Sequence, residues 1–142
     1  MSNTRIVLNY KSIFSFFLTT LVVLGMSYSL AFAGQSGGWN KQEIKVKGAW
    51  SIEQRADGNY LILDDAFKTK NAPDLKFFVS KKGFSSINGK NATDGAVLVS
   101  KLKSTKGGQE YKIPANINLS DYSSLVLHCE QYSKLWASTP LK

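Results

Sequence analysis

Short stretches in which apolar and polar residues alternate dominate the chain after residue 43. The apolar positions with this period of two are Ile44, Val46, Trp50, Ile52, Leu75, Phe77 and Val79. Because successive side chains of a strand point to opposite faces, this period predicts strands with one buried face. The same reasoning predicts further strands at 59–63, 96–102, 110–113, 124–130 and 132–138.

Turn-forming residues separate these stretches and indicate the fold class. Asp57-Gly58 lies between two strand-like stretches and is a strong hairpin signal, because both residues tolerate a positive φ. Gly107-Gly108 and Pro114 mark other turns, and no segment has the period of an amphipathic helix. Seven or eight short strands in roughly 100 residues predict an all-β fold, a single antiparallel β-sandwich or flattened barrel.

Two features interrupt the strand pattern. Gly48 falls on the inner face of its stretch, where a glycine indicates a bend or bulge that another part of the backbone approaches closely. The stretch 81–95 is rich in Lys, Gly, Asn and Ser. We therefore expect a long exposed loop there, and the most mobile part of the domain.

Residues 1–33 have the features of an export signal. They contain Arg5 and Lys11 but no acidic residue, followed by an apolar run, and they end with Ala-Phe-Ala, a small-residue cleavage pattern. Cleavage is expected before Gly34, which predicts a secreted or periplasmic protein. The alternative is an uncleaved membrane anchor, because the apolar run approaches the ~20 residues that span a bilayer.

The expected organisation follows from this boundary. A signal peptide occupies 1–33, a flexible Gly/Ser lead-in occupies 34–43, and one small β domain occupies 44–142. A membrane partner is expected only if the N-terminal segment stays uncleaved.

The net charge of +8 comes almost entirely from lysine. Five lysines that form a possible basic surface are Lys81, Lys82, Lys101, Lys103 and Lys106. Such a surface suits anionic lipid or polysaccharide, although dispersed lysines on strands and turns commonly serve solvation and edge protection. No nucleic-acid partner is expected, because the chain has an export signal and no nucleic-acid-binding motif.

Cys129 is the only cysteine, so it cannot form an internal disulfide and is either a packing residue or the reacting atom. Strand alternation places it on the inner face with Leu125 and Leu127. His128, the only histidine, then points to the outer face and is expected at the surface. One cysteine and one histidine are too few for a zinc site, so no metal is predicted, and a Ser/His/Asp hydrolase is disfavoured.

The last third of the chain resembles a known family. It contains the ordered pattern G-x-Q-x-Y-x-I-P, then L-S-x-Y-x-S, a hydrophobic strand ending in cysteine, and an aromatic closing strand. The matching positions are Gly107 or Gly108, Gln109, Tyr111, Ile113, Pro114, Leu119, Ser120, Tyr122, Ser124, Cys129, Tyr132, Trp136, Ala137 and Leu141. Upstream, Gly48, Leu63, Phe67, Pro73, Asp74, Leu75, Val79 and Ser80 continue the likeness. The chain resembles the electron-transfer DM-thirteen (DM13) domain.

This resemblance implies a β-sandwich module, often found beside DOMON-type cytochrome domains, that acts in redox chemistry through its cysteine. Cys129 would then be the redox thiol and would work with a redox partner protein. A thiol of this kind can pass through sulfenic acid or a mixed disulfide, or ligate haem iron, so haem is a possible cofactor. Tyr111, Tyr132 and Trp136 are candidates, with Cys129, for residues that surround such a group.

A second hypothesis gives the protein a different class of function. A cysteine among leucines packs as a small hydrophobic residue, and its reactivity is suppressed there. The chain would then be a non-enzymatic extracytoplasmic binding or interaction module with an inert Cys129. Under either hypothesis, no independent catalytic activity is expected.

Overall fold

The computed structural model describes residues 34–142, and the expected signal peptide at 1–33 lies outside the described residues. The described part contains eleven strands and two short 3-10 helices, so the all-β prediction is confirmed. The strands are β1 (Ser36–Gly37), β2 (Lys41–Gln42), β3 (Val46–Lys47), β4 (Trp50–Arg55), β5 (Gly58–Leu63), β6 (Lys68–Thr69), β7 (Leu75–Ser80), β8 (Val97–Lys101), β9 (Gln109–Lys112), β10 (Ser124–Cys129) and β11 (Lys134–Pro140), and the helices are η1 (Phe84–Ser86) and η2 (Leu119–Asp121). No helix within 34–142 is long and apolar enough to cross a membrane.

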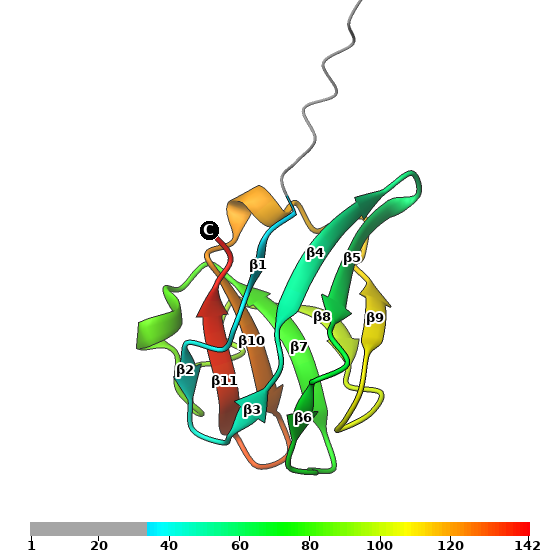
Figure 1. Ribbon diagram of the computed structural model, residues 1–142. Coiled ribbons are helices and arrows are strands. Elements are labelled where there is room, and N and C mark those ends of the chain that lie inside the picture. The colour runs from blue at the N-terminus through cyan, green and yellow to red at the C-terminus, as the bar shows by residue number, and fades with distance from the viewer. Residues whose placement is uncertain (1–33) are drawn as a thin grey trace, which may run out of the picture. The chain divides into compact units, whose positions relative to one another are not determined.

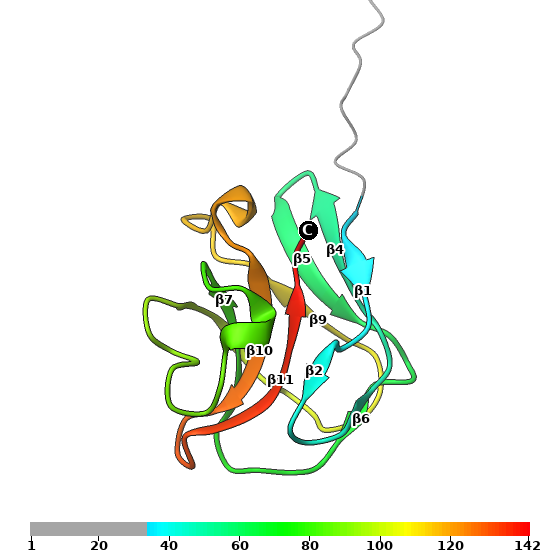
Figure 2. The ribbon, with the colours of Figure 1, turned by 90° about the vertical axis from the view of Figure 1, so that its left-hand side faces the viewer.

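Two antiparallel sheets form the sandwich (Figure 1). One has the strand order β1-β4-β5-β9, and the other has the order β2-β11-β10-β7-β8. Strands β3 and β6 form a separate two-stranded ribbon. A view turned by 90° shows β4, β5 and β9 on one side and β7, β10 and β11 on the other (Figure 2).

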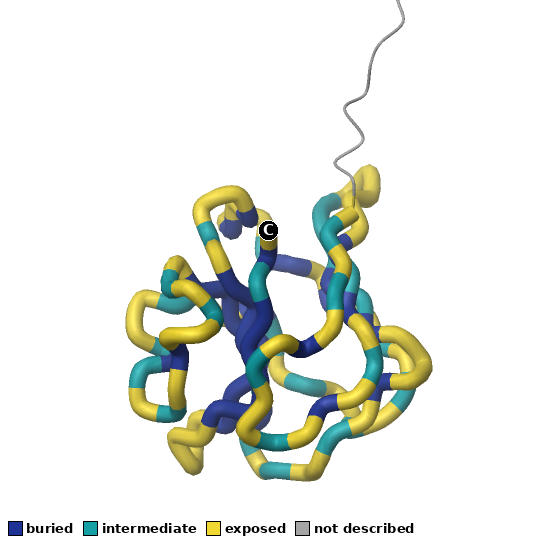
Figure 3. Tube along the Cα trace, turned by 60° about the vertical axis from the view of Figure 1, so that its left-hand side comes forward, coloured by how far each residue is buried: buried dark blue, intermediate teal, exposed yellow. Residues whose placement is uncertain are grey.

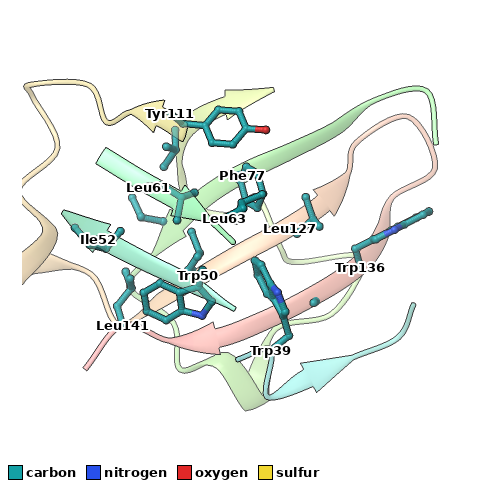
Figure 4. Packing of buried hydrophobic residues seen from close by; sticks show 14 of the residues in the cluster. Trp39, Trp50, Ile52, Leu61, Leu63, Phe77, Tyr111, Leu127, Trp136 and Leu141 are labelled. Atoms are coloured by element: carbon teal, nitrogen blue, oxygen red, sulfur yellow. The ribbon is translucent and has the colours of Figure 1, made fainter. Parts of the chain in front are cut away.

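The main core lies between the inner faces of these two sheets (Figure 4). Trp50 and Leu61 come from the four-stranded sheet, whereas Phe77 and Leu127 come from the five-stranded sheet. Each of these four side chains is at most 3% exposed. Burying one large apolar side chain contributes about 1.5–3 kcal/mol. The apolar positions of the alternating pattern therefore stabilise the fold mainly through their burial between the sheets.

Gly48 confirms the expected close approach of backbone. Its φ is +85°, and a Cβ placed on it would lie 2.6 Å from Phe67 N and 2.7 Å from Phe67 Cα. Glycine alone adopts this conformation at little cost and leaves the space that the second chain segment occupies.

Strand β11 contains a bulge opposite β10. Leu127 pairs with Ala137 and His128 pairs with Leu135, so Trp136 is the extra residue. Trp136 and Ala137 therefore both reach the main core although they are neighbours in sequence, whereas Leu135 faces the outer side. A bulge of this kind changes the face on which the following residues lie.

The segment 81–96 packs on the outer face of the five-stranded sheet, which corrects the expectation of an exposed loop. Ile87 and Ala92 are at most 1% exposed and form a second apolar cluster with Phe78, Val126 and Leu135. In Figure 3 the buried stretches lie in the interior of the fold, while most of the turns around them are exposed. The sheet strands beneath this segment are therefore buried on both faces.

Two serines of the sheet fasten the same segment by hydrogen bonds. Ser124 Oγ donates to Lys82 O at 2.6 Å, and Ser138 Oγ donates to Phe84 O at 2.8 Å. Polar residues thus form part of the packing because each buried hydroxyl has a backbone acceptor.

Candidate functional site around Cys129

Cys129 is the last residue of β10, a strand that lies between β7 and β11. The thiol is a free cysteine, is 0% exposed and belongs to the main core, so its predicted inward orientation is confirmed. In the register of the sheet, Cys129 lies opposite Leu75 on one side and Lys134 on the other. A sulfur enclosed in this way cannot meet a reactant unless the surrounding structure opens.

Leu75 is both the strand neighbour of Cys129 and a lining residue of a surface hollow. Glu130 N donates to Asp74 O at 3.2 Å, one step beyond the Cys129 and Leu75 pair. This pattern makes the two residues a non-hydrogen-bonded pair, in which the Cα atoms are about 4.5 Å apart and the side chains are close. Leu75 is 3% exposed and lines a surface hollow of about 390 Å³.

The hollow in front of Leu75 is polar and cationic. It lies between the segment Asn71–Ala72 and the segment 101–105, which contributes Lys101, Lys103, Ser104 and Thr105. Lys103 Nζ donates to the carbonyl oxygen of Glu110 and lies 4.7 Å from the centre of the Tyr111 ring. Ammonium, hydroxyl and amide groups of this kind suit an anionic group better than an apolar cofactor.

Gln109 and Tyr111, the Q-x-Y pair of the sequence, hold the segment beside this hollow. The Tyr111 hydroxyl donates to Gln109 Oε1 at 2.6 Å and accepts from Lys103 N at 3.0 Å. Gln109 Oε1 also accepts from Ser104 N at 2.9 Å, and Gln109 Nε2 donates to Ser104 O and to Gly107 O. Burial raises the pKa of Tyr111, so its phenol stays neutral and keeps these bonds.

Tyr111 also ends a row of aromatic rings in the main core. Its ring centre lies 5.3 Å from that of Phe77, which lies 6.2 Å from that of Trp39. Figure 4 shows Phe77 between the other two rings. The row crosses from one sheet to the other and stabilises their packing.

The other two predicted aromatic residues lie in different surroundings. Trp136 is 5% exposed and lies in the main core, and its buried Nε1 has no hydrogen-bond partner among residues 34–142. Tyr132 is 61% exposed in the turn between β10 and β11. Cys129, Tyr111 and Trp136 thus share the main core, whereas Tyr132 is a surface residue.

His128 is buried, so the expectation that it lies at the surface is wrong. It is 2% exposed on the outer face, and its ring lies 6.4 Å from that of Phe78. Its Nδ1 is buried and finds no hydrogen-bond partner in the described part of the chain. Burial lowers the pKa of His128 below its usual value. The alternation gave the correct face but could not reveal that 81–96 packs on this face, against Phe78, Val126 and Leu135.

The residues around Cys129 do not fit a haem or a metal ion. Across 34–142, no group of three His, Cys, Asp or Glu side chains gathers as a metal site. His128 and Cys129 lie on opposite faces of β10. Four surface hollows, of about 390, 500, 210 and 220 Å³, are lined by other residues, and Cys129 lines none of them. A macrocycle would need a cavity against the sulfur.

Comparison with protein families gives one match, to the family described as Electron transfer DM13, over residues 39–141. Comparison with curated proteins and with solved structures gives no significant match. The matched range contains both sheets except β1, the cysteine at the end of β10, and the Gln109 and Tyr111 pair. Because the match covers most of the chain, the protein belongs to the Electron transfer DM13 family.

Proposed function

We propose that this protein is an exported electron-transfer module in which Cys129 is the redox group and Leu75 is its cover. The observation that supports this proposal is that Leu75 pairs with Cys129 in the register of β7 and β10 and also lines a cationic hollow. Family membership supports the electron-transfer role, and the pattern of residues 1–33 supports export.

The chemistry that fits a single cysteine is exchange with a disulfide of a partner protein. Cys129 loses its proton, and its thiolate attacks one sulfur of that disulfide. The S–S bond of the partner breaks as a new S–S bond to Cys129 forms, and the departing thiolate takes up a proton. The Cys129 sulfur is oxidised and the departing sulfur is reduced, so electrons and protons balance within this step.

Positive charge at the hollow suits this exchange. Lys101 and Lys103 line the hollow, where the departing thiolate would carry a negative charge. The thiol itself is sealed in the resting structure, so the exchange requires local opening at Leu75. Openings of this kind, smaller than complete unfolding, occur where few buried contacts hold a segment.

The test compares the rate at which a thiol reagent modifies Cys129 in native protein and in two variants. Leu75→Ala removes the cover, and Leu61→Ala is the matched control because Leu61 is 0% exposed on the opposite sheet. Both changes should cost about 2–5 kcal/mol. We expect Leu75→Ala to accelerate modification well beyond its effect on global unfolding, and Leu61→Ala to accelerate it only in proportion to unfolding.

If the rate of Cys129 modification rises only in proportion to global unfolding in both variants, the redox role is overturned. Cys129 would then be a packing residue, and the protein would be a non-enzymatic extracytoplasmic binding module, an alternative that the full burial of Cys129 favours. Export is tested separately by cell fractionation and by sequencing the N-terminus of the mature protein, which we expect to begin at Gly34.

A further inference from the structure

Three lysines lie side by side on a small ribbon next to the hollow. Lys47 of β3 pairs with Lys68 of β6, and Lys68 pairs with Lys106 of the segment that follows β8. Directly opposed residues of antiparallel strands point to the same face, so the three side chains form one row. Neighbouring strands are about 4.8 Å apart, and the row therefore spans about 10 Å at the backbone. We call these three residues the lysine row.

The inner side of the same ribbon explains why the lysines face outward. Val46 pairs with Thr69, Val46 is 4% exposed and belongs to the main core, and Thr69 Oγ1 donates to Lys45 O at 3.0 Å. Since alternate residues face opposite sides of a strand, the neighbours of Val46 and Thr69 must point to solvent. All three lysines of the row are exposed.

The charges of the lysine row are not neutralised by ion pairs within the part of the chain that the structure describes. None of its members forms an ion pair with an acidic residue of the described region 34–142. Asp64 and Asp65 lie between the two strands of the ribbon in sequence, and Asp64 Oδ2 accepts a hydrogen bond from Ala49 N. Like charges directly opposite one another on neighbouring strands are destabilising.

Five other basic residues of 34–142 have acidic partners, whereas the rest, Lys81, Lys90 and Lys142 among them, have none. The cations that do have acidic partners are Arg55 with Glu53 and Glu110, Lys76 with Asp74 and Glu130, Lys82 with Asp94, Lys112 with Asp57, and Lys134 with Glu43. The row, at the ribbon end of the domain, differs from the other lysines without ion pairs because its three members lie on neighbouring strands. The tip of the β4–β5 hairpin, which has paired charges, lies at the opposite end (Figure 1).

The position of the row associates it with the hollow at Leu75. Thr69 N donates to Thr105 O at 2.9 Å, and Thr105 lines the hollow together with Lys101 and Lys103. The exposed Lys70 continues the chain from the ribbon towards Asn71, another lining residue. A partner that reaches the hollow would therefore meet the lysine row as well.

An acidic protein surface fits these observations better than a membrane. Among residues 34–142, the large hydrophobic side chains that are exposed are Leu98 and Tyr132, and neither belongs to the row or lines the hollow. Stable membrane binding usually adds buried apolar area to the attraction of charges. Transient electron-transfer complexes instead have small interfaces and are guided by complementary charge.

We propose that the lysine row of Lys47, Lys68 and Lys106 is a docking surface for an acidic face of the redox partner protein. This inference rests on the proposed function, because it assigns a partner to the hollow in front of Cys129. Its charges guide the encounter, so binding weakens as salt screens them.

The test measures binding of a fluorescently labelled poly-L-glutamate peptide by anisotropy at low and at physiological salt. The test variant is Lys47→Gln/Lys68→Gln/Lys106→Gln, and the matched control is Lys81→Gln/Lys90→Gln/Lys142→Gln, whose exposed lysines lie elsewhere and whose loss changes the net charge equally. We expect the affinity to fall about tenfold in the test variant and less than about twofold in the control. Thermal unfolding followed by circular dichroism should show the test variant folded and slightly more stable, because like charges have been removed.

Three outcomes would overturn the inference. Equal losses in both variants would mean that net charge alone attracts the peptide. Tighter, row-dependent binding to phosphatidylserine vesicles would indicate a membrane, and tighter, row-dependent binding to alginate would indicate a polysaccharide. Because the peptide has no disulfide, the same measurement on Cys129→Ser separates the proposals: unchanged binding there leaves the docking surface standing even if the Leu75 labelling test fails.

Discussion

Leu75 and Cys129 lie opposite one another at the ends of β7 and β10, and Leu75 also lines the cationic hollow. The two strands are joined by a long stretch of chain, so this proximity exists only in the folded sheet. Leu75 is 3% exposed and Cys129 is 0% exposed, so both side chains are buried in the resting structure. Access to the sulfur therefore depends on the local stability of one strand end.

Gly48 and Gly95 form a matched pair for testing the close backbone contact. Both have a positive φ, of +85° and +67°, but a Cβ on Gly48 would meet Phe67 N at 2.6 Å, while a Cβ on Gly95 would meet nothing within 4 Å. Gly95→Ala should cost about 1–2 kcal/mol, from the left-handed conformation alone. Gly48→Ala should cost about 3 kcal/mol or more, because Phe67 must also move. Urea unfolding of both variants measures the difference, and equal costs would show that the backbone at Phe67 yields freely.

Gln109→Ala should loosen the segment beside the hollow. The substitution removes the hydrogen bonds of Gln109 to Ser104, Gly107 and Tyr111, and the Tyr111 hydroxyl loses its acceptor. We expect a loss of about 1–3 kcal/mol in unfolding free energy and faster hydrogen exchange at Ser104 N.

The control for this change is Gln131→Ala, in the exposed turn between β10 and β11. It should change stability by no more than about 0.5 kcal/mol. If Ser104 N exchanges as slowly in Gln109→Ala as in the native protein, the segment that contains Ser104 is held by its other contacts. The Q-x-Y pair then does not organise the hollow.

Stability should fall as the pH drops below about 6.5, because His128 is buried in its neutral form. Burial lowers the pKa of His128 in the folded state from the value of 6.5, while Glu130, Glu43 and Asp74 act in the opposite direction. The unfolded chain then binds the proton first, so protonation favours unfolding from about pH 6.5 down to the folded pKa, by at most ~1.4 kcal/mol per pH unit.

The measurement is urea unfolding at a series of pH values between about 7.5 and 5, above the range in which ordinary carboxylates titrate. His128→Gln should remove this part of the pH dependence, although its stability at neutral pH will differ from that of the native protein. An identical slope in native protein and variant would assign the effect to other groups.

Much of the sandwich could be predicted because its longer strands carry their own signal. Alternation of Leu75, Phe77 and Val79 gave β7 and its inner face, and Asp57-Gly58 gave the turn between β4 and β5. The two-residue strands β1, β2 and β6 were not predicted, since two residues are too short to show a period, whereas β3 falls within the alternation that begins at Ile44. The lysine row could not be predicted either, because it depends on the pairing of these short strands.

The surroundings of the candidate site depended on contacts that a sequence does not reveal. The inward orientation of Cys129 followed from local alternation, but its pairing with Leu75 is set by register between distant strands. The segment that covers the outer face of the five-stranded sheet gave a weaker signal: Ile87 and Ala92 are apolar exceptions in a polar stretch, and both are buried. Isolated apolar residues in a long loop are therefore worth reading as anchors.

The segment 81–96 gives the domain a second, smaller cooperative unit. It leaves the sheet at the end of β7 and returns at the start of β8, so it can detach without breaking any pairing between strands of the sandwich. Its hold consists of the small cluster around Ile87, the hydroxyls of Ser124 and Ser138, and a few surface bonds. We expect segment 81–96 to unfold locally before the sandwich unfolds. Its detachment will expose the outer face of β10 to solvent, while the inner face that carries Cys129 stays buried.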